Sequence, residues 1–194
     1  MKKVILLLVT LIFTASSSAA DPNTPTERVK AAVDDILAIA QDNALPSEQK
    51  YENLGVAIKS HVDLQAASQR VIAKHWRKAT KEQKIEFMGL FRQVLTNTYG
   101  KLLETYTNEE VRFENEKIKK EKYASVDTIV ISGGKEIPVT YQLLKRGDNW
   151  KIYDFVAEGI SLVRSYSTDY QSVLRKGGIE SLNKQLADKL AATE

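Results

Sequence analysis

The sequence contains no cysteine among its 194 residues. No disulfide can therefore stabilise the fold, and none is required, because a chain of this length can bury a sizeable hydrophobic core. A lipoprotein anchor, which needs a cysteine directly after the export signal, is also excluded. Histidine is almost as scarce, with two in the whole chain, and this leaves little material for a metal site.

Motifs for metal, nucleotide or acyl-transfer chemistry are also missing. No group of acidic residues joins His61 and His75 to complete a metal site. The chain has no G-x-S-x-G, no G-x-G-x-x-G and no P-loop. Gly133-Gly134 joins two predicted strands, and no helix follows that could receive a phosphate, so this pair is predicted to be a turn. No cofactor is expected.

The chain also lacks a strong excess of charge. Lys2 and Lys3 belong to the first twenty residues, which have the pattern of a cleaved signal peptide, as described below. Without them the chain has 26 basic and 25 acidic residues, so its net charge is near +1. Nucleic-acid binding relies on a clustered positive field. Nucleic acid is therefore not an expected partner.

The first twenty residues have the pattern of a secretory signal peptide. Lys2 and Lys3 precede an apolar run from Val4 to Phe13, and small residues lead up to Ala20. A run of this length is too short to cross a bilayer, which needs about 20 residues, and no second long apolar run follows. We expect cleavage after Ala20 and export of residues 21–194 as one soluble domain.

Residues from about 21 to 108 are predicted to be helical. Thr24-Pro25-Thr26-Glu27 and Thr80-Lys81-Glu82-Gln83 have the sequence of capping boxes, and Asp63 can cap a further helix. Behind Thr80 the longest predicted helix runs to about Tyr106. Its apolar residues cover more than one stripe, which indicates contacts on two sides.

Residues from about 109 to 194 are predicted to form a sheet and C-terminal helices. Alternating apolar residues mark four strands, within 111–113, 126–131, 137–144 and 150–156, and helices follow over about 159–175 and 178–190. The predicted class is α+β. It comprises a strongly curved, four-stranded antiparallel sheet covered by helices, together with an N-terminal helical subdomain.

One carboxylate falls within an otherwise apolar strand pattern. Trp150, Ile152 and Val156 keep the two-residue period, and Asp154 takes the place between them. Asp154 is therefore a candidate general base in a buried site. The structural alternative is a carboxylate near the open end of the sheet that accepts hydrogen bonds from turn amides or pairs with Arg164.

Two stretches of the chain are similar to one known family. The first is residues 73–83, AKHWRKATKEQ, followed by Phe87 and Phe91. The second is WKIYD at 150–154 with EGISLV at 158–163. Both resemble the periplasmic phospholipid-binding proteins of the Mla (maintenance of lipid asymmetry) system, also called the toluene-tolerance family, and the resemblance covers most of the mature chain. That family commonly has Asn, Arg and Phe where this chain has Ser165, Ser167 and Tyr170.

The resemblance implies a non-enzymatic carrier whose cargo is a glycerophospholipid. It implies a monomer that carries lipid between an outer-membrane lipoprotein-porin complex and an inner-membrane ABC transporter complex with its lipid-binding ring. It further implies a nuclear-transport-factor-like sheet with acyl chains held in an apolar pocket between sheet and helices.

Strand alternation and helical spacing predict which side chains line such a pocket. From the sheet these are Ile129, Ile131, Val139, Tyr141, Leu143 and Ile152. From the helices they are Tyr99, Leu103, Tyr106, Ile160, Val163 and Tyr166. A register slip of one residue would invert the sheet assignments.

Two other hypotheses stay open at the level of sequence. One is a small-molecule enzyme resembling a steroid isomerase, with Asp154 as the general base. The other is a solid-cored adaptor that only bridges membrane complexes.

Overall fold

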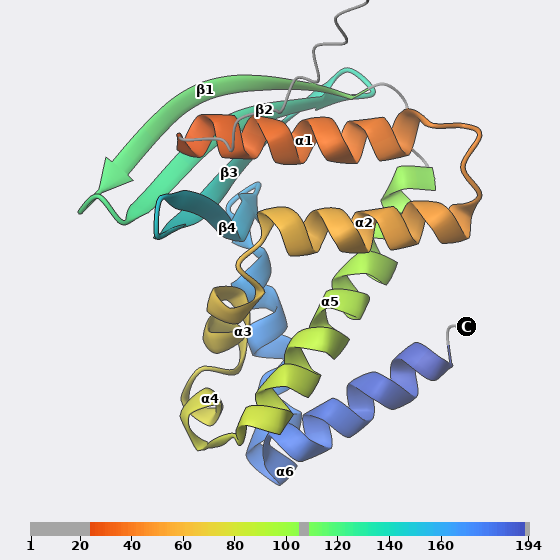
Figure 1. Cartoon of the computed structure of the whole chain (residues 1–194), viewed down its shortest axis with the longest axis vertical. Helices are drawn as coiled ribbons and strands as arrows, with labels where there is room; N and C mark the ends of the chain where they lie inside the picture. The colour runs from red at the N-terminus through yellow and green to blue at the C-terminus, as the bar shows by residue number, and fades with distance from the viewer. Residues whose placement is uncertain (1–23, 105–108, 193–194) are drawn as a thin grey trace, which may run out of the picture.

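A curved sheet lies over one helix, and the remaining helices form a second body beside it (Figure 1). The computed structural model describes residues 24–104 and 109–192, without the side chains of residues 102–104. The helices are α1 (Pro25–Gln41), α2 (Ser47–His61), α3 (Leu64–Ile72), α4 (Lys74–Lys78), α5 (Lys81–Glu104) and α6 (Leu162–Ala191). The strands are β1 (Glu110–Lys119), β2 (Tyr123–Ser132), β3 (Lys135–Arg146), β4 (Asn149–Ala157) and β5 (Ile160–Ser161).

The sheet is an antiparallel meander in the order β1-β2-β3-β4-β5. The predicted α+β class and antiparallel sheet are confirmed, but the sheet has five strands and not four. After Ala157 the chain turns through Glu158 and Gly159, and Ile160 pairs back onto Ala157. A strand of two residues is too short to leave an alternation in the sequence, which is why it was not predicted.

The helix starts follow from local capping chemistry. The Thr24 hydroxyl accepts a hydrogen bond from the Glu27 amide at 3.1 Å, and the Glu27 carboxylate accepts one from the Thr24 amide at 2.9 Å. Thr80 and Gln83 make the same reciprocal pair at the start of α5. Asp63 caps α3. Both predicted capping boxes and the predicted Asp63 cap are therefore confirmed.

The buried apolar residues form two large clusters. In the first, Val29, Ala32 and Val33 of α1 pack against one face of the sheet, here called the inner face, through Ala124, Val126, Leu143, Trp150 and Ile152. The second, here called the helical cluster, joins α3, α5 and α6 through residues that include Val71, Ile72, Phe87, Phe91, Leu174, Leu182 and Leu186. Helix α1 thus belongs with the sheet, although it lies in the helical half of the sequence.

The segment between α2 and α3 attaches the helices to the second edge of β4. The Asp63 amide donates to the Ile152 carbonyl at 2.7 Å, and Val62 forms an isolated parallel bridge to Ile152. The Asp63 carboxylate, already the cap of α3, also accepts from the Arg146 guanidinium at 2.5 Å. One residue therefore starts a helix and joins it to two strands.

Asp154 fixes the start of α6 to β4. One carboxylate oxygen accepts from the Ser161 hydroxyl at 2.6 Å, and the other accepts from the Val163 amide at 3.0 Å. The Ser161 hydroxyl in turn accepts from the Arg164 amide at 3.0 Å as the N-cap of α6. The structure therefore shows the structural alternative for Asp154. Its carboxylate accepts hydrogen bonds from a backbone amide and a hydroxyl, and Arg164 makes no ion pair with it.

Helix α6 is two helical segments joined at Gly178. This residue has φ 68° and ψ −161°, whereas its neighbours on both sides are helical. The turn in direction lets Ile179, Leu182 and Leu186 of the second segment reach the helical cluster. The two separate C-terminal helices predicted from the sequence correspond to these two segments.

Helices of the described segments are all too short or too polar to cross a bilayer. The predicted signal peptide, residues 1–20, lies outside those segments.

We expect Asp154→Ala to lower the free energy of unfolding by about 1.5–3 kcal/mol, because it removes hydrogen bonds to a charged acceptor. Asp154→Asn should cost less, since its amide oxygen still accepts one bond. Urea unfolding followed by circular dichroism measures both. Asp34→Ala, at an exposed position of α1, is the matched control and should change stability by less than about 0.5 kcal/mol. Equal losses in Asp154→Ala and the control would contradict the role of Asp154.

Gly178→Ala should destabilise the protein by about 1–3 kcal/mol, because the backbone at this position is in a region that is almost exclusive to glycine. The matched control is Gly89→Ala within α5, where an added Cβ meets no atom within 4 Å. That variant should be stabilised by about 0.5–1 kcal/mol, since alanine is the better helix former. The same unfolding assay measures the change in the free energy of unfolding for both variants. Similar destabilisation of the two would show that the backbone conformation of Gly178 does not require glycine.

Candidate functional site: a hollow at the open end of the sheet

The inner face of the sheet is tightly packed under α1, whereas along the end of β4 it is partly open. Under α1, Val126 and Leu143 are 1% and 0% exposed. Toward the end of β4, Phe155 and Ala157 are only partly buried, although both lie on the same face. Helix α1 thus covers only part of the apolar face.

A hollow of about 430 Å³ lies at this open end. It lies where the end of α5, the turn between β4 and β5, and the first two turns of α6 come together. Six side chains give it an apolar wall: Tyr99, Phe155, Ala157, Ile160, Leu162 and Tyr166. Its volume falls within the range of about 300–1,000 Å³ that is typical of ligand clefts.

Aromatic rings hold the wall in place. The Tyr99 ring packs edge-on to Phe155 with centroids 5.6 Å apart, and Tyr166 packs edge-on to Phe91 at 5.2 Å. Burial, with smaller contributions from Tyr166 and Asp154, raises the pKa of the Tyr99 phenol. Burial also raises the pKa of Tyr141 to about 12. Both of these phenols are therefore uncharged at neutral pH.

The rim of the hollow is polar and faces solvent. Glu158, Ser165 and Asp169 line it beside the apolar wall, and Glu158 and Asp169 are exposed. Ile160 is 67% exposed at the same mouth. An apolar wall with a wet, polar rim is suited to an amphiphile whose hydrocarbon part enters and whose polar part remains in water.

Three of the twelve predicted lining residues belong to this hollow, namely Tyr99, Ile160 and Tyr166. Val139 and Tyr141 lie on the same inner face, directly opposite Ala157 and Phe155 on β4. For these residues, the alternation along β3 predicted the face correctly.

Leu143, Ile152 and Val163 lie elsewhere. Leu143 and Ile152 are buried under α1, at the packed end of the inner face. Val163 is 7% exposed within the helical cluster. Tyr106 lies outside the described residues, and of Leu103 only the backbone, in α5, is described.

The prediction that Ile129 and Ile131 share a face with Val139, Tyr141 and Leu143 is wrong. Val139 pairs with Thr128, whereas Ile129 and Ile131 pair with Pro138 and Glu136, and paired residues of antiparallel strands point to the same side. The two isoleucines therefore lie on the outer face. The end of β2 carries β-branched residues on both faces, so the hydrophobic pattern did not determine its register.

The two-residue period of Trp150, Ile152 and Val156, which would leave Phe155 on the opposite face, does not hold along β4. The β3–β4 register shifts between Gln142 and Leu143: Leu143 pairs with Ile152, but Gln142 pairs with Asp154. This β-bulge inserts Tyr153 and reverses the alternation beyond it. Asp154 thereby moves off the inner face and Phe155 moves onto it. The sequence contained one sign of this bulge, namely that the alternation placed the carboxylate of Asp154 on the apolar inner face.

No catalytic constellation accompanies Asp154 in the described part of the chain. Both of its carboxylate oxygens accept hydrogen bonds from the start of α6. His61 is 2.6 Å from Asp35 and 3.4 Å from Arg28 in a contact between α1 and α2. Burial, followed by Lys74 and Lys78, lowers the pKa of His75. In residues 24–104 and 109–192 no three metal-binding side chains come together.

Solved structures include a protein of the same fold with a ligand. This is the phospholipid-binding protein from Ralstonia solanacearum, solved in complex with a phospholipid. It superposes with a TM-score of 0.79 at 26% sequence identity, covering 89% of this chain and 98% of that one.

Related sequences agree with the structural comparison. The intermembrane phospholipid transport system binding protein MlaC of Haemophilus influenzae is 23% identical over 187 residues, which cover 92% of this chain and 87% of that protein. Toluene tolerance protein ttg2D of Pseudomonas putida is 28% identical over 130 residues, 66% of this chain and 60% of that protein. The family model for the MlaC protein matches residues 30–188. The chain therefore belongs to the MlaC family, in agreement with the resemblance found in the sequence.

Proposed function

We propose that this protein is a periplasmic phospholipid carrier. After export and cleavage behind Ala20, it binds the acyl chains of a glycerophospholipid in the hollow at the open end of the sheet. It then shuttles lipid between the outer-membrane lipoprotein-porin complex and the inner-membrane ABC transporter complex. The family membership and the phospholipid bound to the Ralstonia solanacearum relative support this proposal.

The partly covered inner face is the observation that carries the proposal. Phe155, Ala157 and Leu162 present apolar surface to the hollow, while the mouth carries carboxylates. An acyl chain in the hollow would cover the part of the inner face that α1 leaves exposed. The head group would remain at the rim, in contact with water.

The energetics of such a carrier favour tight retention. Burying one methylene group is worth about 0.8 kcal/mol, so an acyl chain of roughly 16 carbons gains on the order of 12 kcal/mol by staying out of water. Retention therefore needs no network of polar contacts to the head group. Release, by contrast, needs a partner that offers another apolar site, which is the role proposed for the membrane complexes.

Mass spectrometry of an organic extract of the purified mature protein tests the proposal directly. We expect phospholipid in stoichiometric amount and a mature N-terminus at Asp21. An empty protein whose turnover of a small molecule depends on Asp154 would instead support the isomerase-like enzyme. An empty protein without turnover would support the adaptor.

Ala157→Trp should reduce the phospholipid that co-purifies with the protein to well below half of the wild-type amount. Ala157 is partly exposed in the wall of the hollow, and an indole ring there would occupy space that an acyl chain needs. The measurement is phospholipid phosphorus per mole of protein. Ala157→Ser, at the same position without added bulk, should keep its lipid. If a folded Ala157→Trp protein retained the wild-type amount of phospholipid, the hollow would not be the binding site.

A further inference from the structure

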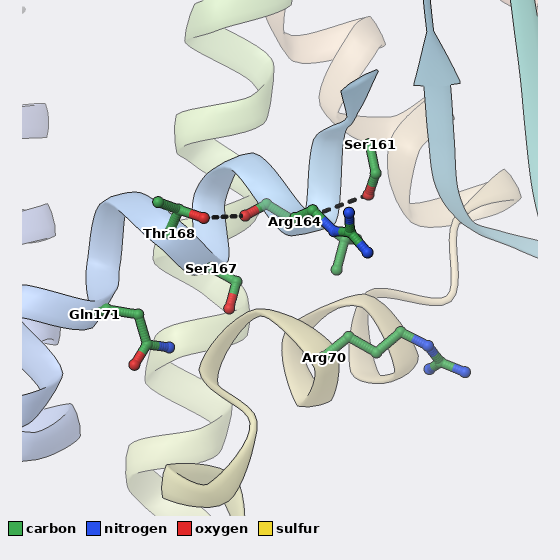
Figure 2. A pocket seen from close by; sticks show the side chains of 7 residues that line it. Arg70, Ser161, Arg164, Ser167, Thr168 and Gln171 are labelled. Carbon is green, nitrogen blue, oxygen red and sulfur yellow. Dashed lines mark hydrogen bonds between the residues drawn. The ribbon is translucent and has the colours of Figure 1, made fainter. Parts of the chain in front are cut away.

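A second hollow lies on the opposite side of α6 from the first. It has a volume of about 350 Å³ and lies between α3 and the start of α6 (Figure 2). Ser161, Arg164, Thr168 and Gln171 recur three or four residues apart and face it, whereas Leu162, Ser165, Tyr166 and Asp169 face the apolar hollow. The first turns of α6 therefore separate two sites of different character. We call the second one the α3–α6 groove.

Six of the seven residues that line the α3–α6 groove carry a side-chain hydrogen-bond donor, and the seventh is Val163. Arg164, Ser167 and Gln171 project from α6, and Arg70 projects from α3 with its guanidinium directed away from Ser167 and Gln171 (Figure 2). No carboxylate is among its lining residues. Within the described segments, the side chains of Arg164, Ser167 and Gln171 make no hydrogen bond or ion pair. These donors are available to an anion.

Arg70 is held in position before any ligand arrives. Its guanidinium lies over the Tyr153 ring, 4.0 Å from the ring centroid, and donates to the Ala66 carbonyl at 2.8 Å. It also hydrogen-bonds the Tyr153 side chain. A guanidinium has five N–H donors, so these bonds use only part of its donor capacity. A guanidinium that is already ordered loses less entropy when it binds an anion.

The surrounding surface is also positively charged. Between Asp63 and Glu82 the chain has five basic residues and no acidic one: Arg70, Lys74, Arg77, Lys78 and Lys81. The pKa of His75 is lowered by burial and, in addition, by the positive charges of Lys74 and Lys78. Asp154 on neighbouring β4 already uses both carboxylate oxygens in hydrogen bonds. The whole chain is nearly neutral, so this is a local concentration of positive charge.

We propose that the α3–α6 groove binds a phosphate group through Arg70 and Arg164, with Ser167 and Gln171 as further donors. Phosphate suits this set better than carboxylate, because its several oxygens can accept from two guanidinium forks and from neutral donors at once. The phosphate can belong to a soluble anion or to a lipid head group in a membrane surface. The site does not depend on the proposed carrier function.

Two probes distinguish these sources. Inorganic phosphate, titrated by isothermal calorimetry, tests the soluble anion. Sedimentation with vesicles of phosphatidylcholine containing phosphatidylglycerol, against phosphatidylcholine alone, tests the membrane surface. The proposal is supported if the protein binds either probe and if its affinity falls about tenfold in both Arg164→Gln and Arg70→Gln. Arg70→Lys should recover only part of the affinity, since an ammonium group lacks the fork.

Arg175→Gln is the matched control for loss of one positive charge. Arg175 is exposed on the same helix, eleven residues beyond Arg164 and outside the α3–α6 groove, and its variant should bind like the wild type. Equal weakening in Arg175→Gln, or binding of neither probe by the wild type, overturns the proposal. Binding of a poly-glutamate peptide without binding of phosphate would also overturn it.

Lipid content separates this proposal from the carrier function. Arg164→Gln changes no residue of the apolar hollow, so its co-purifying phospholipid should equal that of the wild type. Loss of phosphate binding together with retained lipid supports a distinct site. Loss of both, in a protein with an unchanged melting temperature, would show that the α3–α6 groove is part of the lipid site and would overturn the proposal of a separate one.

Discussion

The apolar inner face of the sheet extends beyond the helix that covers it, and the function proposed here depends on this mismatch. Helix α1 packs against Val126, Leu143 and Ile152 and excludes water from that end. Beyond its reach, Phe155 and Ala157 remain on the same face with only partial cover. Apolar surface left open to water is costly at about 25 cal/mol per Å². A hydrocarbon ligand that fills the hollow would recover this free energy.

Helix α6 forms a wall of both hollows. Asp154 holds its first turn against β4 through Ser161 and the Val163 amide. One face of these turns completes the apolar hollow with Leu162 and Tyr166, and the opposite face carries the donors of the α3–α6 groove. A single hydrogen-bonded attachment therefore positions an apolar surface and a cationic surface back to back.

Local sequence signals predicted the elements well, and long-range pairing decided the site. The capping boxes at Thr24 and Thr80 mark helix starts because both partners of each bond lie within three residues. The face of Ile129, however, depends on its pairing with Pro138 on another strand. The inward position of Phe155 depends on a bulge that no period in the sequence reveals. Tyr99 and Tyr166, which helical spacing placed in the predicted pocket, both line the hollow, because each lies on a helix whose own period determines its face.

Residue types and short-range spacing were enough to predict the α+β class, the starts of α1, α3 and α5, and the family. Long-range pairing and packing, in contrast, determine which face each residue of β2 and β4 occupies, how far α1 covers the sheet, and that Arg70 and Arg164 line one groove. Arg70 and Arg164 are 94 positions apart in the chain. Their proximity results from packing of α3 against α6, which no local pattern encodes.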